Sequence, residues 1–116
     1  MTGAELVALL EQHRFASSEE AQLQDGIAAA LIAAGVPHTR ELRLGTRDRI
    51  DFLVGTVGLE VKIDGSLPAL ARQLQRYAEA PIVSELVVFT TRARLAQLPA
   101  TLLGKPVRVA LQLGVG

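Results

Sequence analysis

The chain has 116 residues, no cysteine, and twelve basic side chains that balance twelve acidic ones. The length fits a single domain, and the lack of cysteine excludes a disulfide scaffold, a thiol nucleophile and a zinc–thiolate site. A net charge of zero argues against a protein that coats nucleic acid by bulk electrostatics, and three phenylalanines with one tyrosine leave no stacking platform for single strands.

The first part of the chain predicts two helices. Thr2 and Glu5 have the spacing of a capping box, and the leucines that follow recur at helical period, so we expect a helix over residues 3–12. A second apolar stripe predicts a helix over residues 17–34, which a glycine and a proline then end.

Beyond residue 37 the apolar period changes to two, which predicts strands. The expected elements are strands over 39–44, 49–54 and 58–63, a helix over 66–79, a strand over 85–90, a short helix over 92–98 and a strand over 107–113. This order predicts one α/β domain over residues 1–116, with a mixed β-sheet flanked by helices.

One predicted hairpin brings three charged side chains together. Gly55-Thr56 suits a two-residue turn of type II′, which makes residues whose numbers sum to 111 face each other. Asp51 then lies opposite Glu60, with Cβ atoms about 4.5–5.5 Å apart, and Lys62 emerges on the same face. The residues expected to point the other way, into the core, are Ile50, Phe52, Leu59, Val61 and Ile63.

Two carboxylates that face each other across a hairpin repel. A hard divalent cation would remove that repulsion, and oxygen ligands suit Mg²⁺ or Mn²⁺. A neighbouring lysine could orient or deprotonate an attacking water while the metal polarises a phosphoryl oxygen. Asp51, Glu60 and Lys62 therefore predict a metal-dependent phosphodiesterase centre.

These residues resemble the PD-(D/E)xK nuclease superfamily. Asp51 followed by Glu60-Val61-Lys62 matches its motif, and the α-β-β-β-α-β order over roughly residues 17–90 resembles its shared core. The resemblance implies a restriction-endonuclease-like fold. Ile50 stands where the family name has proline, a position that is often aliphatic in the family.

The resemblance also implies roles for single residues. The metal would be held by Asp51, Glu60, the Val61 carbonyl and, through water or with a second ion, Glu20. Lys62 would activate the attacking water. Gln73 and Tyr77 resemble the QxxxY signature of one branch of the superfamily and would orient the Lys62 region or a phosphate. Without that role, Tyr77 would lie at the edge of the core with its hydroxyl in water.

Simpler structural roles compete with several of these assignments. Lys62 could serve only as an ion-pair partner across the strands. Ser17 and Glu20 have capping-box spacing, which would explain that glutamate without a metal, and Glu19 is the second candidate for the acid on this helix. Glu41 fits a solvated pair with its neighbouring arginines.

Arginine supplies ten of the twelve basic side chains, and its planar fork suits phosphate oxygens. Six arginines are expected to flank the site and hold a DNA backbone: Arg40, Arg43, Arg47, Arg49, Arg72 and Arg76. Four further basic residues could extend this track: Arg92, Arg94, Lys105 and Arg108. The alternative is a scatter of solvated arginines.

So small a core has no helix-turn-helix or zinc module, and we expect recognition of DNA shape and not of base sequence. The resemblance extends to compact archaeal-type Holliday junction resolvases, also found in phages, which implies a homodimeric endonuclease for branched DNA. Residues 1–16 and 91–116 would then build the dimer contact. The alternatives are a DNA-end or single-strand nuclease of recombination, a catalytically silent DNA-binding module of the same fold, and an unrelated α/β scaffold.

The longest uncharged apolar run, residues 27–36, is too short to cross a bilayer. The chain also begins without the basic and apolar segments of a secretory signal. We therefore expect a cytoplasmic protein that does not contact membranes.

Overall fold

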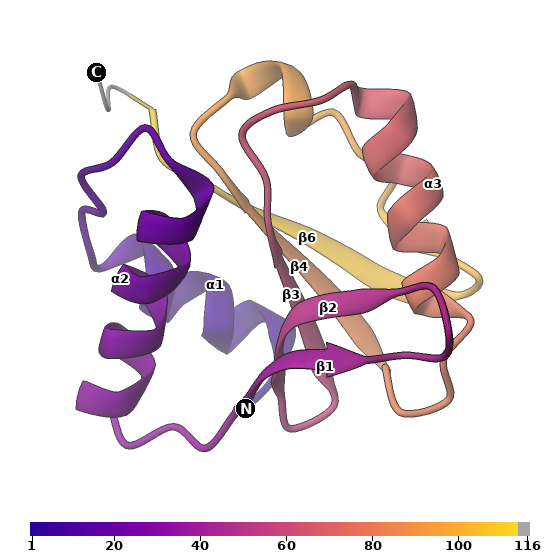
Figure 1. Cartoon of the computed structure of the whole chain (residues 1–116), viewed down its shortest axis with the longest axis horizontal. Coiled ribbons are helices and arrows are strands. Elements are labelled where there is room, and N and C mark those ends of the chain that lie inside the picture. The colour runs from indigo at the N-terminus through magenta and orange to yellow at the C-terminus, as the bar shows by residue number, and fades with distance from the viewer. Residues whose placement is uncertain (114–116) are drawn as a thin grey trace.

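A six-stranded mixed sheet in the order β1-β2-β3-β4-β6-β5 forms the centre of the computed structural model, which describes residues 1–113 (Figure 1). The strands are β1 (Thr39–Arg43), β2 (Arg49–Val54), β3 (Val57–Val61), β4 (Glu85–Thr90), β5 (Thr101–Leu102) and β6 (Lys105–Leu111). The helices are α1 (Gly3–Glu11), α2 (Glu20–Ala33) and α3 (Leu67–Ala78), with a 3₁₀ turn, η1, at Ala93–Leu95. Strands β1 to β3 are antiparallel, while β3, β4 and β6 run parallel.

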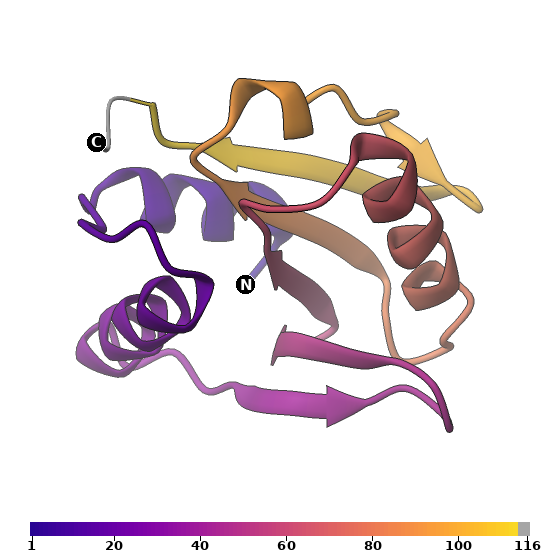
Figure 2. The ribbon, with the colours of Figure 1, turned by 45° about the horizontal axis from the view of Figure 1, so that its top comes forward.

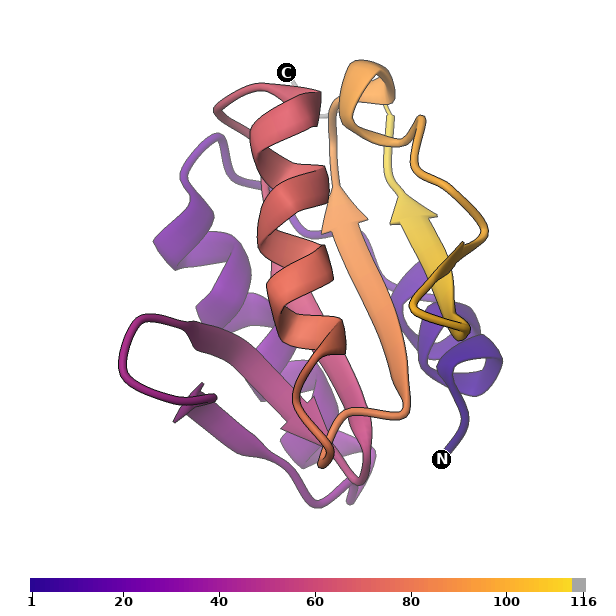
Figure 3. The ribbon, with the colours of Figure 1, turned by 90° about the vertical axis from the view of Figure 1, so that its right-hand side faces the viewer.

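The helices cover both faces of this sheet. Helices α1 and α2 pack on one face and α3 on the other, so the molecule has three layers (Figures 2 and 3). The core is correspondingly split: Leu23 and Phe52 belong to the α1/α2 side, whereas Leu74 and Leu86 belong to the α3 side. The prediction of an α/β domain with a mixed sheet flanked by helices is confirmed. The longest helix of residues 1–113 has 14 residues, and none of the helices there has the length and hydropathy of a membrane span.

Helix α1 begins as the sequence predicts. The Glu5 N–H donates to Thr2 Oγ1 at 3.1 Å, and the Thr2 N–H donates to Glu5 Oε1 at 2.8 Å, which completes a capping box. Leu6 and Leu10 are buried within the chain, against β4 and β6. The apolar face of α1 is thus not left over for a second copy. A dimer contact through residues 1–16 and 91–116 stays a prediction, and residues 114–116 lie outside the described part.

The capping box, considered as an alternative role for Glu20, does not form. Helix α2 begins at Glu20, and its N-cap residue, Glu19, makes no side-chain cap. The Ser17 hydroxyl accepts the Glu19 N–H at 3.0 Å and donates to the Gln22 side-chain oxygen at 2.7 Å, so it does not cap a backbone N–H of the first turn. The start of α2 therefore leaves the Glu20 carboxylate free to bond elsewhere.

The β2–β3 hairpin has the predicted register. Val54 pairs with Val57 and Phe52 with Leu59, so the residue numbers sum to 111. Gly55 has φ +63°, the positive angle that the first position of a type II′ turn requires.

Ile50 does not point where we expected. It lies in the α3-side core, whereas Phe52 lies on the α1/α2 side, so the alternation of β2 is broken between them. The irregularity has a counterpart in β1: Glu41, which the register places opposite Asp51, has φ +53° and interrupts the regular strand. Ile50 consequently covers Gly58, where an added Cβ would lie 2.5 Å from Ile50 Cδ1.

Replacing Gly58 with alanine is expected to lower the free energy of unfolding by about 1–3 kcal/mol, because the new methyl group overpacks a filled core. Urea unfolding measures the loss. The variant Ile50→Val removes the Cδ1 atom that blocks the methyl group, so the alanine should cost less in that background. An equal cost in both backgrounds would contradict this packing.

The segment after β4 differs most from expectation. The predicted helix over 92–98 is wrong: only the three-residue turn η1 forms, and Leu95 is its one buried side chain, so no apolar stripe supports a longer helix. Strand β5 was not predicted, because two residues are too short for a periodic signal. It pairs with the start of β6 through Leu103 and Gly104, whose φ angles are +51° and +76°.

Candidate active site

The candidate site lies where β2 and β3 part. Their backbone pairing ends at Phe52–Leu59. At the next position the Asp51 N–H donates to Glu60 Oε1 at 3.3 Å, and the Val61 N–H donates to Asp51 Oδ2 at 2.8 Å. The carboxylates of Asp51 and Glu60 thus replace the backbone hydrogen bonds between the two strands. The two side chains lie close together, as the hairpin register predicts.

Glu60 is buried and is braced by helix α3. Its side chain is 5% exposed, and its Oε1 atom lies 3.3 Å from the hydroxyl of Tyr77 in the last turn of the helix. The same hydroxyl lies 3.1 Å from the Arg49 carbonyl oxygen, so its one proton serves either acceptor. Tyr77 is fully buried. The expectation of a tyrosine with its hydroxyl in water is therefore wrong.

The Lys62 side chain is more exposed than its partner Glu60. Its Nζ atom lies 3.7 Å from Glu60 Oε2, and its side chain is 24% exposed. The Lys62 N–H donates to the Phe89 carbonyl at 3.0 Å, which continues the pairing of β3 with β4. The ammonium group is thus held at the surface end of the acid pair, a position that suits an ion pair and a catalytic group alike.

Burial disfavours the charged forms of the acids in this site. It raises the pKa of Asp51, and burial together with the charge of Asp51 raises the pKa of Glu60 to about 8. Burial also raises the pKa of Tyr77, with the charges of Glu60 and Asp51 as further causes. The charge of Lys62 opposes the shifts of the two acids. A second, divalent positive charge would relieve the remaining repulsion.

The donor atoms fit a hard cation with retained waters. Within residues 1–113, no three His, Cys, Asp or Glu side chains gather as a metal cluster. Asp51 uses Oδ2 and Glu60 uses Oε1 in hydrogen bonds to backbone N–H groups. A metal could bind Asp51 Oδ1 and Glu60 Oε2, the second of which lies 3.7 Å from Lys62 Nζ. The Val61 N–H faces Asp51, and a strand residue directs its carbonyl to the same side. Two carboxylate oxygens, a carbonyl and several waters suit Mg²⁺.

Glu20 reaches the neighbourhood of the site but binds backbone there. Its Oε1 atom accepts the N–H groups of Ile63 at 2.8 Å and of Asp64 at 3.3 Å. The negative charge of Glu20 still contributes to the raised pKa of Asp51. Glu19 is exposed at the helix start, so Glu20 is the acid of this pair that lies near the site.

Three hollows lie beside α3, the first of them next to Lys62. Their volumes are about 250, 270 and 570 Å³, and Arg76 lines all of them. We call them together the α3 groove. Gln73 lines the first hollow beside Lys62. The other lining residues that carry charge are Asp64, Arg72, Glu79, Arg43 and Asp48.

The six predicted backbone-binding arginines do not share one surface. Arg43, Arg72 and Arg76 line the α3 groove, where Arg76 Nε bonds Asp48 Oδ1 at 3.0 Å. Arg47 and Arg49 are exposed on the β1–β2 hairpin.

Arg40 lies on the opposite side, toward α2. It pairs with Asp25 at 3.1 Å, and its guanidinium carbon is 5.4 Å from the centre of the Phe52 ring. It therefore does not belong to the groove, and it is not the partner that we expected for Glu41.

Three of the four residues expected to extend the track are bonded elsewhere. Arg108 pairs with Glu85, the first residue of β4, at the end of the sheet opposite Lys62. Lys105 donates to the Ala80 carbonyl, and Arg94 donates to the carbonyls of Ile63 and Gly65. These contacts engage the three side chains within the chain, and an extension of the arginine track stays a prediction.

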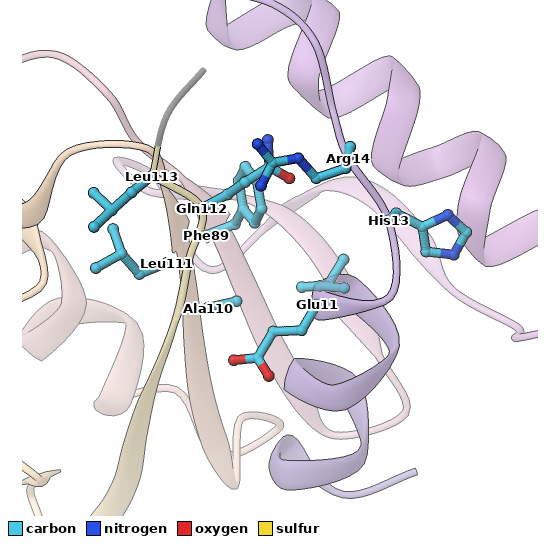
Figure 4. Close-up of a pocket in the computed structure, with 9 residues that line it drawn as sticks. Glu11, His13, Arg14, Phe89, Ala110, Leu111, Gln112 and Leu113 are labelled. Atoms are coloured by element: carbon cyan, nitrogen blue, oxygen red, sulfur yellow. The ribbon is translucent and has the colours of Figure 1, made fainter. Parts of the chain in front are cut away.

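A separate pocket of about 110 Å³ lies between the end of α1 and the end of β6 (Figure 4). Phe89 and Ala110 lie at its base, while Glu11 and Arg14 stand on either side of it. None of the residues predicted to be catalytic lines this pocket. It is thus distinct from the Asp51–Glu60–Lys62 centre.

Two contacts near the site were missed from the sequence. Asp48 holds Arg76 across 28 residues, and Arg94 reaches Gly65 across 29. No local pattern marks either contact, because only the packing of distant elements brings these side chains together.

Searches of family models, curated proteins and solved structures found no match to this chain.

Proposed function

We propose that the protein is a metal-dependent DNA endonuclease of the PD-(D/E)xK type, which hydrolyses phosphodiester bonds in branched DNA such as four-way junctions. One observation carries the proposal: the partly buried Asp51 and the buried Glu60 form an acid pair where two strands part, and Lys62 Nζ lies 3.7 Å from Glu60 Oε2. Buried acids with raised pKa values beside a lysine are typical of functional sites.

The topology supports a restriction-endonuclease-like fold. Elements α2 to β4 follow the order α-β-β-β-α-β, with three antiparallel strands and then a parallel one. Helices α2 and α3 lie on opposite faces. This is the arrangement expected from the resemblance of residues 17–90 to the nuclease core.

Each polar residue of the site has a role in this reaction. Mg²⁺, or Mn²⁺ in its place, would polarise a phosphoryl oxygen and stabilise the leaving oxyanion from its position on Asp51, Glu60 and the Val61 carbonyl. Lys62 orients or deprotonates the attacking water. Tyr77 holds Glu60 in its orientation through the 3.3 Å contact, and the amide of Gln73 faces the groove, where it can bond a phosphate oxygen.

The α3 groove supplies the path for the DNA backbone. Arg43, Arg72 and Arg76 lie along it, and contacts of this kind fix position without reading sequence. Recognition of DNA shape, and with it a preference for branched DNA, follows from a backbone path without a base-reading element. Two copies of the chain would provide two sites for paired cuts.

The burial of Glu60 favours a second candidate, a DNA-end or single-strand nuclease. An acid that is 4% exposed lies below the surface, and an unpaired strand bends into such a site more readily than a rigid duplex does. A silent DNA-binding module is the third candidate. A module without catalytic activity would not need the acid pair Asp51 and Glu60, whose mutual repulsion destabilises the site.

A cleavage panel tests the proposal: linear duplex, single strand, flap and four-way junction, each with Mg²⁺, Mn²⁺ or EDTA. We expect cutting with either metal, fastest on the junction, and none in EDTA. The variant Asp51→Asn, purified in parallel, controls for contaminating nucleases. Absence of metal-dependent cutting on every substrate would remove the enzyme proposal, and cutting restricted to single strands would favour the second candidate.

A further inference from the structure

Two side chains from distant elements hold the segment 62–65, which leads from β3 to α3. Glu20 of α2 accepts the Ile63 N–H at 2.8 Å and the Asp64 N–H at 3.3 Å. Arg94 of η1 donates to the Gly65 carbonyl at 2.6 Å and to the Ile63 carbonyl at 3.4 Å. The N–H and the carbonyl of Ile63 are therefore bound by charged groups of opposite sign.

This arrangement fixes a stretch of backbone that has left the sheet. The last pairing bond of β3 is the Lys62 N–H to the Phe89 carbonyl, at 3.0 Å. Ile63 is 1% exposed, so its peptide group needs protein partners. Hydrogen bonds to ionised groups are about twice as strong as neutral ones. Lys62 is thus held by β4 on one side and by Glu20 and Arg94 immediately beyond it.

We propose that Glu20 and Arg94 are positioning residues, which together hold Lys62 against Glu60, and that Glu20 serves the site in this way and not as a metal ligand. The catalytic part of this inference rests on the proposed function. The Nζ–Oε2 distance of 3.7 Å depends on where the Lys62 backbone lies, and a misplacement of about 1 Å can lower a reaction rate about 100-fold.

Kinetics of conservative variants separate the two roles of Glu20. The amide oxygen of Glu20→Gln still accepts both N–H groups, so a positioning role predicts that this variant keeps most of kcat, whereas Glu20→Ala loses about 10- to 100-fold. The Mg²⁺ concentration for half-maximal rate should stay within about twofold in both. A metal ligand predicts the reverse: Glu20→Gln would be as impaired as Glu20→Ala and would need more Mg²⁺, a result that would overturn the proposal.

Arg94 provides the second arm of the test. Arg94→Ala should lower kcat about as much as Glu20→Ala, with KM for DNA little changed, because Arg94 is bonded to the loop and not directed along the α3 groove. Arg14→Ala is the matched control, an exposed arginine that lines the separate pocket beside α1 and not the α3 groove, and should keep the wild-type rate. A raised KM with unchanged kcat in Arg94→Ala would overturn the positioning role in favour of DNA binding.

Amide hydrogen exchange in the metal-free protein tests the contact without reference to cleavage. Glu20→Ala should speed exchange at Ile63 and Asp64 by about tenfold or more, while amides of α1 keep their protection, and Glu20→Gln should change it much less. Unchanged exchange at Ile63 would overturn the proposal whether or not the protein cuts DNA. Faster exchange in a protein that cuts no substrate would refute the proposed function and the catalytic part, and would leave the structural contact supported.

Discussion

Replacing Lys62 with methionine is expected to lower the rate of DNA cleavage by about 10²- to 10⁴-fold, the usual loss when a general acid or base is removed. Methionine keeps the apolar stem of the side chain and removes the ammonium group, which in the wild type lies 3.7 Å from Glu60 Oε2. Rates measured on the best substrate of the panel under saturating Mg²⁺ give the size of the loss. Binding of the same DNA in Ca²⁺ should change little, since the arginines of the α3 groove remain.

The variant Lys62→Arg separates catalysis from ion pairing. Arginine keeps the positive charge opposite Glu60, but its guanidinium does not give up a proton. If Lys62 serves only as an ion-pair partner, arginine should restore most of the rate. If it handles the attacking water, arginine should be about as slow as methionine. Near-native turnover in Lys62→Met would show that the catalytic centre lies elsewhere.

Replacing Glu60 with glutamine is expected to abolish cleavage and, in the absence of metal, to stabilise the fold at alkaline pH. The pKa of Glu60 is raised from its ordinary value of 4.5 to about 8. Its protonated form is therefore favoured by folding, and that contribution is fully present below about pH 4.5. It is lost as the pH rises through about 8, where the metal-free wild type should be weaker by a few kcal/mol.

Urea unfolding at pH 5, 7 and 9 in EDTA checks this prediction. The wild type should lose stability over this range relative to Glu60→Gln, because glutamine carries no ionisable group and still has an oxygen for the Asp51 N–H. Mg²⁺ should then stabilise the wild type at pH 9 more than at pH 5, where protons compete with the metal, and should leave the variant almost unchanged. Parallel pH profiles in EDTA would show that Glu60 is not the buried acid described above.

Short-range sequence patterns predicted most of the fold and the centre of the candidate site. The capping box at Thr2 and the turn at Gly55 act over a few residues. The first determines where α1 begins, and the second determines the register of β2 and β3. The hairpin register needs only the turn, and that register alone brought Asp51 to Glu60. Lys62 then follows from strand alternation.

What the sequence could not predict depends on packing between distant elements. Glu20 has the same spacing to Ser17 whether it caps its own helix or reaches Ile63, and only the position of α2 against β3 decides. The reversal of Ile50 accompanies a left-handed backbone at Glu41, a conformation that glutamate rarely adopts.

That backbone at Glu41 also affects how two copies of the chain can meet. Strand β1 is an edge of the sheet, and an edge strand presents unpaired N–H and carbonyl groups to which another strand can add. A residue with φ +53° in its middle turns part of that row out of line. The opposite edge, β5, is only two residues long. It pairs only with Lys105 and Pro106, so the outer edge of β6 is open beyond Val107. Strand addition is therefore disfavoured at β1, and a homodimer of this protein that joined two sheets into one would meet along β6.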